Sequence, residues 1–432
     1  MKDAHDQDLS GASTAGLVAY QAALVQFRCF IGDPAALAEE AIAANPDLTM
    51  AHVLKAWLHL LGTEPGGIAV ARAACEAAAR LPANPRERLH LEAARLLAHG
   101  HWHACARVLE DLSLQYPRDL LALQAGHQVD FFTGNARMLR DRIARALPAW
   151  QPALPGYHAL LSMHAFGLEE TGDYAQAERE GRRSVELQPR DGWGWHAVAH
   201  AHEMRNDPLA GIAWLGQHAA TWSDGSFFAV HNWWHLALFH LELGNVDEVL
   251  RLYDASIATG STVILDLIDA TAMLWRLQLR GVDVGARWDT VADLWQSAGQ
   301  PGLYAFNDLH MMMAYCGAGR EGAQAAVLEA QAQALLRDED NAEFTSVVGD
   351  GAARAIHAFA QGDHVRCAQL LRRIRSSAHR FGGSHAQRDV LDLTLLEAAR
   401  RGSLRHLAEG LQAERLALRP RTRPAAPLAL VA

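Results

Sequence analysis

The sequence is poor in cysteine, in β-branched residues and in long apolar stretches. No two cysteines form a CxxC pair, so neither a disulfide framework nor a thiolate zinc site is predicted. The five cysteines are scattered, at Cys29, Cys75, Cys105, Cys316 and Cys367. No run is apolar enough to cross a bilayer, and the polar N-terminus lacks signal-peptide character. We therefore expect a cytoplasmic protein with no membrane partner.

Concentrated positive charge is also absent. The 432 residues carry a formal net charge of -10 at pH 7, whereas phosphate binding requires a basic face. Nucleic acid is therefore not an expected partner. The sequence contains no phosphate loop and no dinucleotide fingerprint, so no nucleotide cofactor is expected either.

What the sequence does contain is a helical repeat. The segments AANPDLT, LQYPRDL and LQPRDGW end alike, and their prolines, Pro46, Pro117 and Pro189, are separated by 71 and 72 residues. Each interval is about twice the 34-residue period of tetratricopeptide repeats. Proline suits a position after one helix and before the next, because it cannot continue the first.

Helix-turn-helix patterns lie between these markers, as in DFFTGNARMLRDRI and LEETGDYAQAEREG. Apolar residues recur at i, i+3 and i+4 on both sides of each break. We expect an all-α fold, a right-handed solenoid of tetratricopeptide-like helical hairpins. The expected organisation is a flexible N-terminus at 1–14, one solenoid over 15–418 with a centre rich in His and Trp at about 157–310, and a disordered tail at 419–432.

The centre holds the unusual chemistry. Nine of the twelve tryptophans fall between Trp193 and Trp295. In WGWHAVAHAHEM, His196 and His200 are spaced i, i+4 and therefore share one helical face. The next hairpin begins HNWWHLALFH, with a second i, i+4 pair of histidines. Aligning the hairpins by their turns matches His196 with His235, whereas aligning the histidine pairs matches it with His231.

Two imidazoles at i, i+4 can bind zinc or a similar metal from one helix. The sequence is not a zincin motif, because Ala197 and Asn232 stand where HExxH has glutamate. We predict a divalent metal, Zn, Fe or Mn, with ligands drawn from His196, His200, His231, His235 and His310. The predicted catalytic residues are His196, His200, Glu203, His235 and Asp308. The predicted substrate-binding residues are Trp195, His202, Asn232, Trp234, Asn307, Arg388 and Asp389.

A structural interpretation stays open beside this one. Histidines on an alanine-rich face commonly pack in the core, and tryptophans fill gaps between hairpins. Ser384 follows two glycines, as in a nucleophile elbow, but no strand precedes it; a helix cap is the better interpretation.

Several segments together resemble the tetratricopeptide repeat protein 38 family. They include GLEETGDYAQAE at 167–178, HAVAHAHEM at 196–204, HNWWHLALFHLELG at 231–244 and FNDLHMMMAYCGA at 306–318. The resemblance runs from about residue 15 to Leu418. It implies a cytosolic α-helical repeat protein but no particular reaction. The candidate residues above, with Gln387, lie in or beside the family's signature segments.

The leading hypothesis is an enzyme, a hydrolase or lyase, that acts on a small polar metabolite by acid–base chemistry with possible metal assistance. Arg388 would bind an anionic group. The alternatives are a repeat scaffold that binds a peptide or protein partner, and a small-molecule binding protein without turnover. The sequence leaves the substrate, the metal and the oligomeric state open.

Overall fold

The computed structural model describes residues 1–419, and these are helical with no β-strand; two isolated bridges occur, Lys2 with Asp8 and Ile31 with Ser226. The chain divides into two compact units. Unit 1 comprises Met1–Ala201 and His218–Asn232, and unit 2 comprises His202–Gln217 and Trp233–Ala432. The expected all-α architecture is therefore confirmed. The single solenoid expected over 15–418 stays a prediction, and the tail expected at 419–432 lies, apart from Arg419, outside the described residues.

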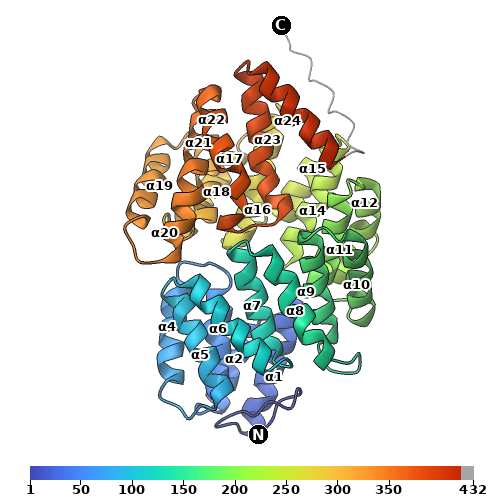
Figure 1. Cartoon of the computed structure of the whole chain (residues 1–432), viewed down its shortest axis with the longest axis vertical. Helices are drawn as coiled ribbons and strands as arrows, with labels where there is room; N and C mark the ends of the chain where they lie inside the picture. Colours follow the sequence, from blue (N-terminus) through green and yellow to red (C-terminus); the bar gives the residue numbers. More distant parts are fainter. Residues whose placement is uncertain (420–432) are drawn as a thin grey trace. The chain divides into compact units, whose positions relative to one another are not determined.

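Successive helices of unit 1 pack against each other as hairpins, α1 with α2, α3 with α4, α5 with α6 and α9 with α10 (Figure 1). The helices of this unit are α1 (Thr14–Cys29), α2 (Pro34–Ala44), α3 (Thr49–Leu60), α4 (Gly67–Ala78), α5 (Pro85–Ala98), α6 (Trp102–Gln115), α7 (Leu120–Phe132), α8 (Ala136–Ala146), η1 (Leu147–Ala149), α9 (Tyr157–Glu170), α10 (Tyr174–Leu187), most of α11 (Gly192–Met204), α13 (Ala219–Ser223) and the start of α14 (Ala229–Glu242).

Unit 2 repeats the arrangement, with α16 against α17, α18 against α19 and α21 against α22. Its helices are the rest of α11 and α14, with α12 (Pro208–Gly216), α15 (Val246–Leu252), η2 (Tyr253–Ile257), α16 (Ile264–Leu279), α17 (Arg287–Ala298), α18 (Ala305–Gly317), α19 (Glu321–Ala334), α20 (Asp340–Phe344), η3 (Thr345–Gly349), α21 (Asp350–Ala360), α22 (His364–Ile374), η4 (Arg375–Phe381), α23 (His385–Arg401) and α24 (Arg405–Leu418). None of the helices in the described residues is both long and apolar enough to span a membrane.

The turn inside several hairpins follows from a positive-φ glycine followed by Asn or Asp, as at Gly32, Gly134, Gly172, Gly244 and Gly362. Gly134 ends α7 at φ 65°, where its N–H bonds Phe131 O at 3.1 Å and the next N–H, of Asn135, bonds Asp130 O at 2.8 Å. These two bonds form a Schellman motif, which favours glycine because φ is positive. The Asn135 side chain then accepts from the N–H of Met138 and caps α8. One dipeptide thus ends one helix and starts the next.

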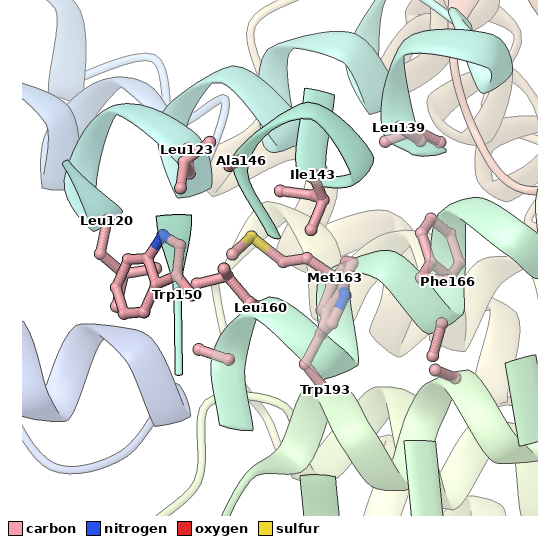
Figure 2. Packing of buried hydrophobic residues seen from close by; sticks show 13 residues of the cluster. Leu120, Leu123, Leu139, Ile143, Ala146, Trp150, Leu160, Met163, Phe166 and Trp193 are labelled. Atoms are coloured by element: carbon pink, nitrogen blue, oxygen red, sulfur yellow. The ribbon is translucent and has the colours of Figure 1, made fainter. Parts of the chain in front are cut away.

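The core of unit 1 is continuous across three hairpins. Figure 2 shows Leu160, Met163 and Phe166 of α9 facing Ile143 of α8 and Trp193 of α11. Burying such side chains contributes roughly 1.5–3 kcal/mol each before the loss of conformational entropy is counted. This packing fixes the helix that carries the first pair of candidate histidines.

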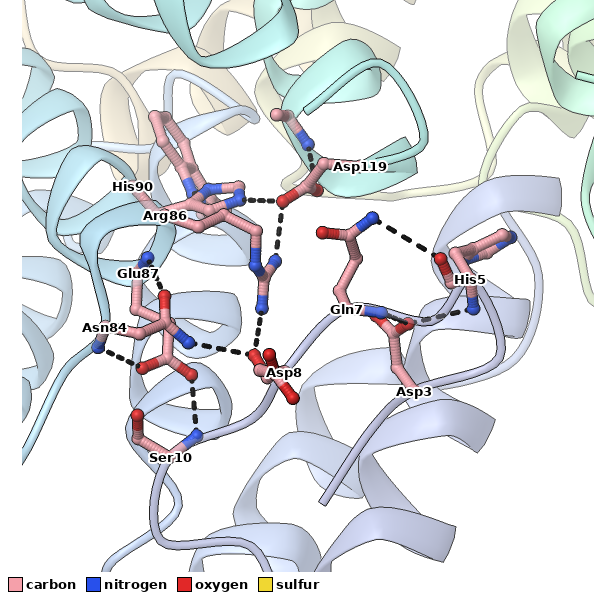
Figure 3. Close-up of polar contacts among 12 residues, drawn as sticks. Asp3, His5, Gln7, Asp8, Ser10, Asn84, Arg86, Glu87, His90 and Asp119 are labelled. Atoms are coloured by element: carbon pink, nitrogen blue, oxygen red, sulfur yellow. Dashed lines mark hydrogen bonds and ion pairs between the residues drawn. The ribbon is translucent and has the colours of Figure 1, made fainter. Parts of the chain in front are cut away.

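The N-terminal residues, predicted to be flexible at 1–14, make specific contacts with α5 and the loops around it (Figure 3). The carbonyl of Asp8 accepts from Arg86 Nη2 and from Asn84 Nδ2, both at 3.0 Å. Arg86 in turn pairs with Asp119 at 2.6 Å, and His90 Nε2 lies 2.9 Å from the same carboxylate. The sequence alone does not predict this buried Arg–His–Asp network. It shows only that polar residues occupy positions where the helical periodicity indicates burial.

Candidate functional site

Three of the predicted ligand side chains converge in unit 1. His196 and His200 lie one turn apart on α11, and His231 lies in the first turn of α14. The Nε2 atoms of His196 and His231 are 3.2 Å apart, and the ring centroids of His196 and His200 are 4.3 Å apart. One ring nitrogen from each of the three lies within 4.8 Å of the others. This contact agrees with the alignment of the two hairpins that matches His196 with His231.

The start of α11 is set by polar contacts. The Asp191 carboxylate accepts from the N–H groups of Trp193 and Gly194, at 3.1 and 3.2 Å, and so caps the helix. The Asn232 side chain donates to the carbonyl of Gly192 at 3.2 Å and thereby ties α14 to this end of α11. Asn232, predicted to bind substrate, therefore positions the two helices that carry the histidines.

Aromatic rings surround the three histidines. Phe166 stacks on His196 with centroids 5.2 Å apart, and the rings of Trp193 and Phe228 lie 5.0 and 4.9 Å from the same imidazole. His196 and His200 are buried, and His231 is half-buried. A low-dielectric wall of this kind strengthens interactions with any charge placed among the rings.

A carboxylate missed by the sequence analysis lies behind His200. Glu169 Oε2 is 3.4 Å from His200 Nδ1, and both side chains are fully buried. A carboxylate at ion-pair distance from one ring nitrogen favours an orientation of the ring in which the other nitrogen can bind a ligand. Glu169 lies in the segment GLEETGDYAQAE, which resembles a family signature. Its contact with His200 could not be predicted from the sequence, because the contact depends on the relative positions of α9 and α11.

The three imidazoles fit a transition metal. Zinc binds imidazole nitrogen at about 2.0–2.1 Å, so two nitrogens on one tetrahedral zinc lie about 3.3–3.4 Å apart. The 3.2 Å between the Nε2 atoms of His196 and His231 is close to that value. Three histidine ligands also leave one coordination position open, as in catalytic zinc sites. Thiolates are not expected to compete, because burial raises the pKa of the Cys29 and Cys367 thiols to about 12.

His235 and Glu203, the next predicted residues on α14 and α11, form a pair within unit 2. His235 Nδ1 lies 3.1 Å from Glu203 Oε2, and both side chains are buried. Arg419 approaches the other oxygen of the carboxylate at 3.9 Å. The pair has the geometry of an oriented acid–base couple.

Asp308 and His310, both on α18, are buried and hydrogen-bonded within their own hairpin. Burial raises the pKa of Asp308 to about 7, although the N–H of Gly302 donates to its carboxylate at 2.9 Å. Burial lowers the pKa of His310 to about 4, and its Nδ1 bonds Phe306 O at 2.8 Å. A pKa near neutrality is one property that an acid–base group needs, and the catalytic role of Asp308 stays a prediction. His310 joins no cluster of three or more potential metal ligands in the described part of the chain.

Arg388 and Asp389 make contacts that compete with the predicted anion binding. The Arg388 guanidinium donates to the carbonyl of Gly383, and Asp389 pairs with Arg415 through two bonds of 2.6 and 2.9 Å. Asp389 nevertheless lines a hollow in unit 2, together with Glu203. Ser384 accepts from the N–H of Gln387 as a helix cap, as predicted.

The remaining predicted binding residues are buried side chains. Trp195 donates its indole N–H to Pro189 O at 2.8 Å, and Arg276 lies over the Trp234 ring at 5.2 Å. His202 and Asn307 are buried on α11 and α18. The structure therefore gives Trp195 and Trp234 packing partners and brings the clearest chemical cluster together at His196, His200 and His231.

No family model matches the chain. Similarity to solved structures spans most of its length. Human IFIT1, solved as a dimer with m7Gppp-AAAA, has 15% identity over 96% of this chain and 95% of its own, with a TM-score of 0.44. The APC/C hetero-tetramer Cut9-Hcn1 has 14% identity over 88% and 76%, with a TM-score of 0.38. The P58(IPK) TPR domain has 13% identity over 90% and 89%, with a TM-score of 0.22.

Proposed function

We propose that this helical repeat protein binds a divalent transition metal, zinc in the first place, through His196, His200 and His231. The observation that carries the proposal is the 3.2 Å separation of two Nε2 atoms on facing helices, next to a third imidazole backed by Glu169. Neutral imidazoles suit zinc, iron, nickel and copper better than manganese.

The enzymatic part of the proposal is a metal-dependent hydrolase or lyase acting on a small polar molecule. A bound metal of this type can polarise a substrate oxygen. The protein groups contribute by orientation: the Glu169 carboxylate holds the His200 ring, and the aromatic wall excludes water. Membership of the tetratricopeptide repeat protein 38 family and a cytoplasmic location remain predictions that accompany this proposal.

The test is the metal content of the tag-free protein after exposure to zinc, iron and manganese and removal of excess ion. We expect close to one metal per chain, and loss of most of it in the alanine variants of His196, His200 and His231. His127→Ala is the matched control, because His127 is equally buried and packs on Trp193 but bonds the Met163 carbonyl. Metal retained by all three variants would contradict the proposal.

The second candidate is a non-catalytic scaffold, and the arrangement of repeated helical hairpins supports it, since such arrays commonly bind partners along a groove. It predicts a metal-free wild type with no turnover. Capture of a specific peptide or protein partner by a protein that stays metal-free after loading would favour the scaffold over the enzyme.

A further inference from the structure

Two loops of unit 1 are joined next to the histidine cluster. One loop follows α1 (residues 30–32), and the other is the segment that leads into α14, here called the strap (residues 224–228). Ile31 of the first loop and Ser226 of the strap form an isolated antiparallel bridge. The residues on either side of this pair exchange two backbone hydrogen bonds, of 2.7 and 2.9 Å. The strap is therefore fastened to a loop that lies far from it in the sequence.

Each of the two loops contributes one ring to the aromatic wall around the histidines. The rings of Phe30 and Phe228 are 5.4 Å apart. Phe228 in turn lies 4.9 Å from His196 and 5.2 Å from His231. Both phenylalanines are half-buried, as is His231, whereas Trp193, which also contacts His196, is buried. The half-buried rings mark the side on which the cluster approaches solvent, and the joined loops cover that side.

The backbone of Phe30 is strained in this arrangement. It has φ 56° and ψ 44° at the end of α1, in the left-handed region where glycine is usual. A bulky residue keeps such a conformation only where its surroundings hold it, and residues of this kind occur often at ligand clamps and switches. Here the surroundings include the hydrogen bond that the Phe30 carbonyl accepts from the Phe227 N–H. Loss of the bridge removes one of the contacts that hold this strain.

The strap has anchored ends and an exposed middle. Trp222 before it is buried, and Asn232 after it ties α14 to α11. Between these anchors, Phe227 is 57% exposed, and the Asp224 carbonyl accepts an exposed hydrogen bond from Arg190 at 3.0 Å. A segment that buries little of its own surface can open locally while the fold around it stays intact.

We propose that the strap is a gate over the histidine centre of unit 1. With the bridge between Ile31 and Ser226 formed, Phe30 and Phe228 cover the cluster; with the bridge broken, a metal ion passes between solvent and the histidines. Such a gate changes the rates of metal uptake and release but leaves the metal-to-protein ratio unchanged. The inference rests on the metal site proposed above, and it adds the element that controls access to that site.

The experiment locks the gate with a disulfide. Ile31 and Ser226 are a non-hydrogen-bonded antiparallel pair, since the flanking residues exchange the hydrogen bonds. The Cα atoms of such a pair lie about 4.5 Å apart, which suits a disulfide. The double variant Ile31→Cys/Ser226→Cys is loaded with zinc in its reduced form and then oxidised, and peptide mass spectrometry identifies the joined sulfurs. We expect oxidation to slow zinc capture by a chelator by about tenfold or more, and reduction to restore the rate.

The other isolated bridge of unit 1 supplies the matched control. Lys2 and Asp8 are also flanked by two backbone hydrogen bonds, of 2.9 and 2.7 Å, and lie beside α5 rather than the histidines. The oxidised variant Lys2→Cys/Asp8→Cys should lose zinc at the wild-type rate. Equal slowing in the two oxidised variants would overturn the gate, because a disulfide anywhere in the unit would then have the same effect.

A single substitution loosens the gate instead of locking it. Phe227→Pro removes the N–H that bonds the Phe30 carbonyl. Proline suits this position, because the Ala229 N–H donates to Ser226 O at 3.2 Å and Phe227 is thus the second residue of a β-turn. Zinc capture should be severalfold faster in this variant, whereas Phe227→Ala, which keeps the N–H, should match the wild type. This pair decides the question if the cysteine variant fails to fold; equal rates in the two variants would overturn the gate.

Access to the histidines can also be measured without a metal. Chelator-treated protein is modified with diethylpyrocarbonate, and the rate at His196 and His231 is compared with that at His406, whose side chain is fully exposed. The oxidised gate variant should protect the two histidines relative to its reduced form and leave His406 unchanged. Protection in a chain that binds no zinc would support the gate and contradict the proposed metal site. Normal zinc binding, with neither slower capture nor protection in the oxidised variant, would overturn the gate and leave the metal site standing.

Discussion

At the scale of single residues, the clearest signature of burial is the carboxyl group of Asp308. Its folded-state pKa is about 7, against an ordinary value near 3.8, because burial disfavours the charged form. Between about pH 4 and pH 7 the folded protein therefore holds a proton that the unfolded chain has lost. Folding stability falls as the pH rises through this window, and the full cost of the buried carboxylate is present above pH 7.

Asp308→Asn should remove that pH dependence. The amide keeps an oxygen to accept from Gly302 N–H but carries no charge, so we expect the variant to exceed the wild type in unfolding free energy at pH 8 by on the order of 2–4 kcal/mol. At pH 4 the two proteins should be nearly equal. Denaturant unfolding at several pH values measures this. A constant difference across the pH range would show that the charge of Asp308 is not responsible.

Asp389→Asn is the matched comparison, and its effect on folding stability should have the opposite sign. The Arg415 guanidinium holds the pKa of Asp389 well below its usual range, against the opposing effect of burial. That pair stabilises the fold above the unfolded pKa and is lost as the pH falls through the folded pKa. The Asn variant should therefore be less stable than the wild type at pH 7, with the deficit shrinking in acid.

At the scale of helices and turns, a glycine that ends the first helix determines the turn in several of the hairpins. Gly362, between α21 and α22, has φ 76°, and the N–H of Asp363 bonds Ala358 O at 2.9 Å in the same motif as at Gly134. A Cβ at Gly362 meets nothing within 4 Å, so substitution costs only the strain of the positive φ.

Gly362→Ala should therefore destabilise the protein by about 1–2 kcal/mol. Gly410→Ala is the control, because Gly410 lies inside α24 with open space around it and alanine is the better helix former there. We expect that control to stabilise the protein by about 0.5–1 kcal/mol. Thermal unfolding of both variants measures these changes in stability. Equal changes in the two variants would contradict this account of the turn.

The helices were predictable because local chemistry decides them. Proline after α2, α6 and α10, and glycine followed by Asn or Asp inside the hairpins, mark turns that depend on a few neighbouring residues. The contacts of Asp8 with α5 were not predictable, because they use backbone carbonyls that every residue has. The π-helical segments η2 and η3 likewise have no local sequence signal.

At the scale of the whole molecule, the candidate site was predictable only in part. The i, i+4 spacing placed His196 and His200 on one face, and the following repeat supplied His231. Glu169 was missed because its significance depends on which helix faces it, and that is a property of packing rather than of spacing. The division into two units was also not predicted, since it passes inside α11 and α14 at no composition change.

The central claim is that three imidazoles of unit 1 bind one metal ion, and X-ray absorption of the zinc-loaded protein tests it most directly. We predict a first shell of nitrogen at about 2.0–2.1 Å from zinc with outer-shell scattering from three imidazole rings. His231→Ala should reduce that scattering by one ring, whereas His127→Ala should not change it. A zinc spectrum with oxygen neighbours alone, or with sulfur at about 2.3 Å, would contradict the account.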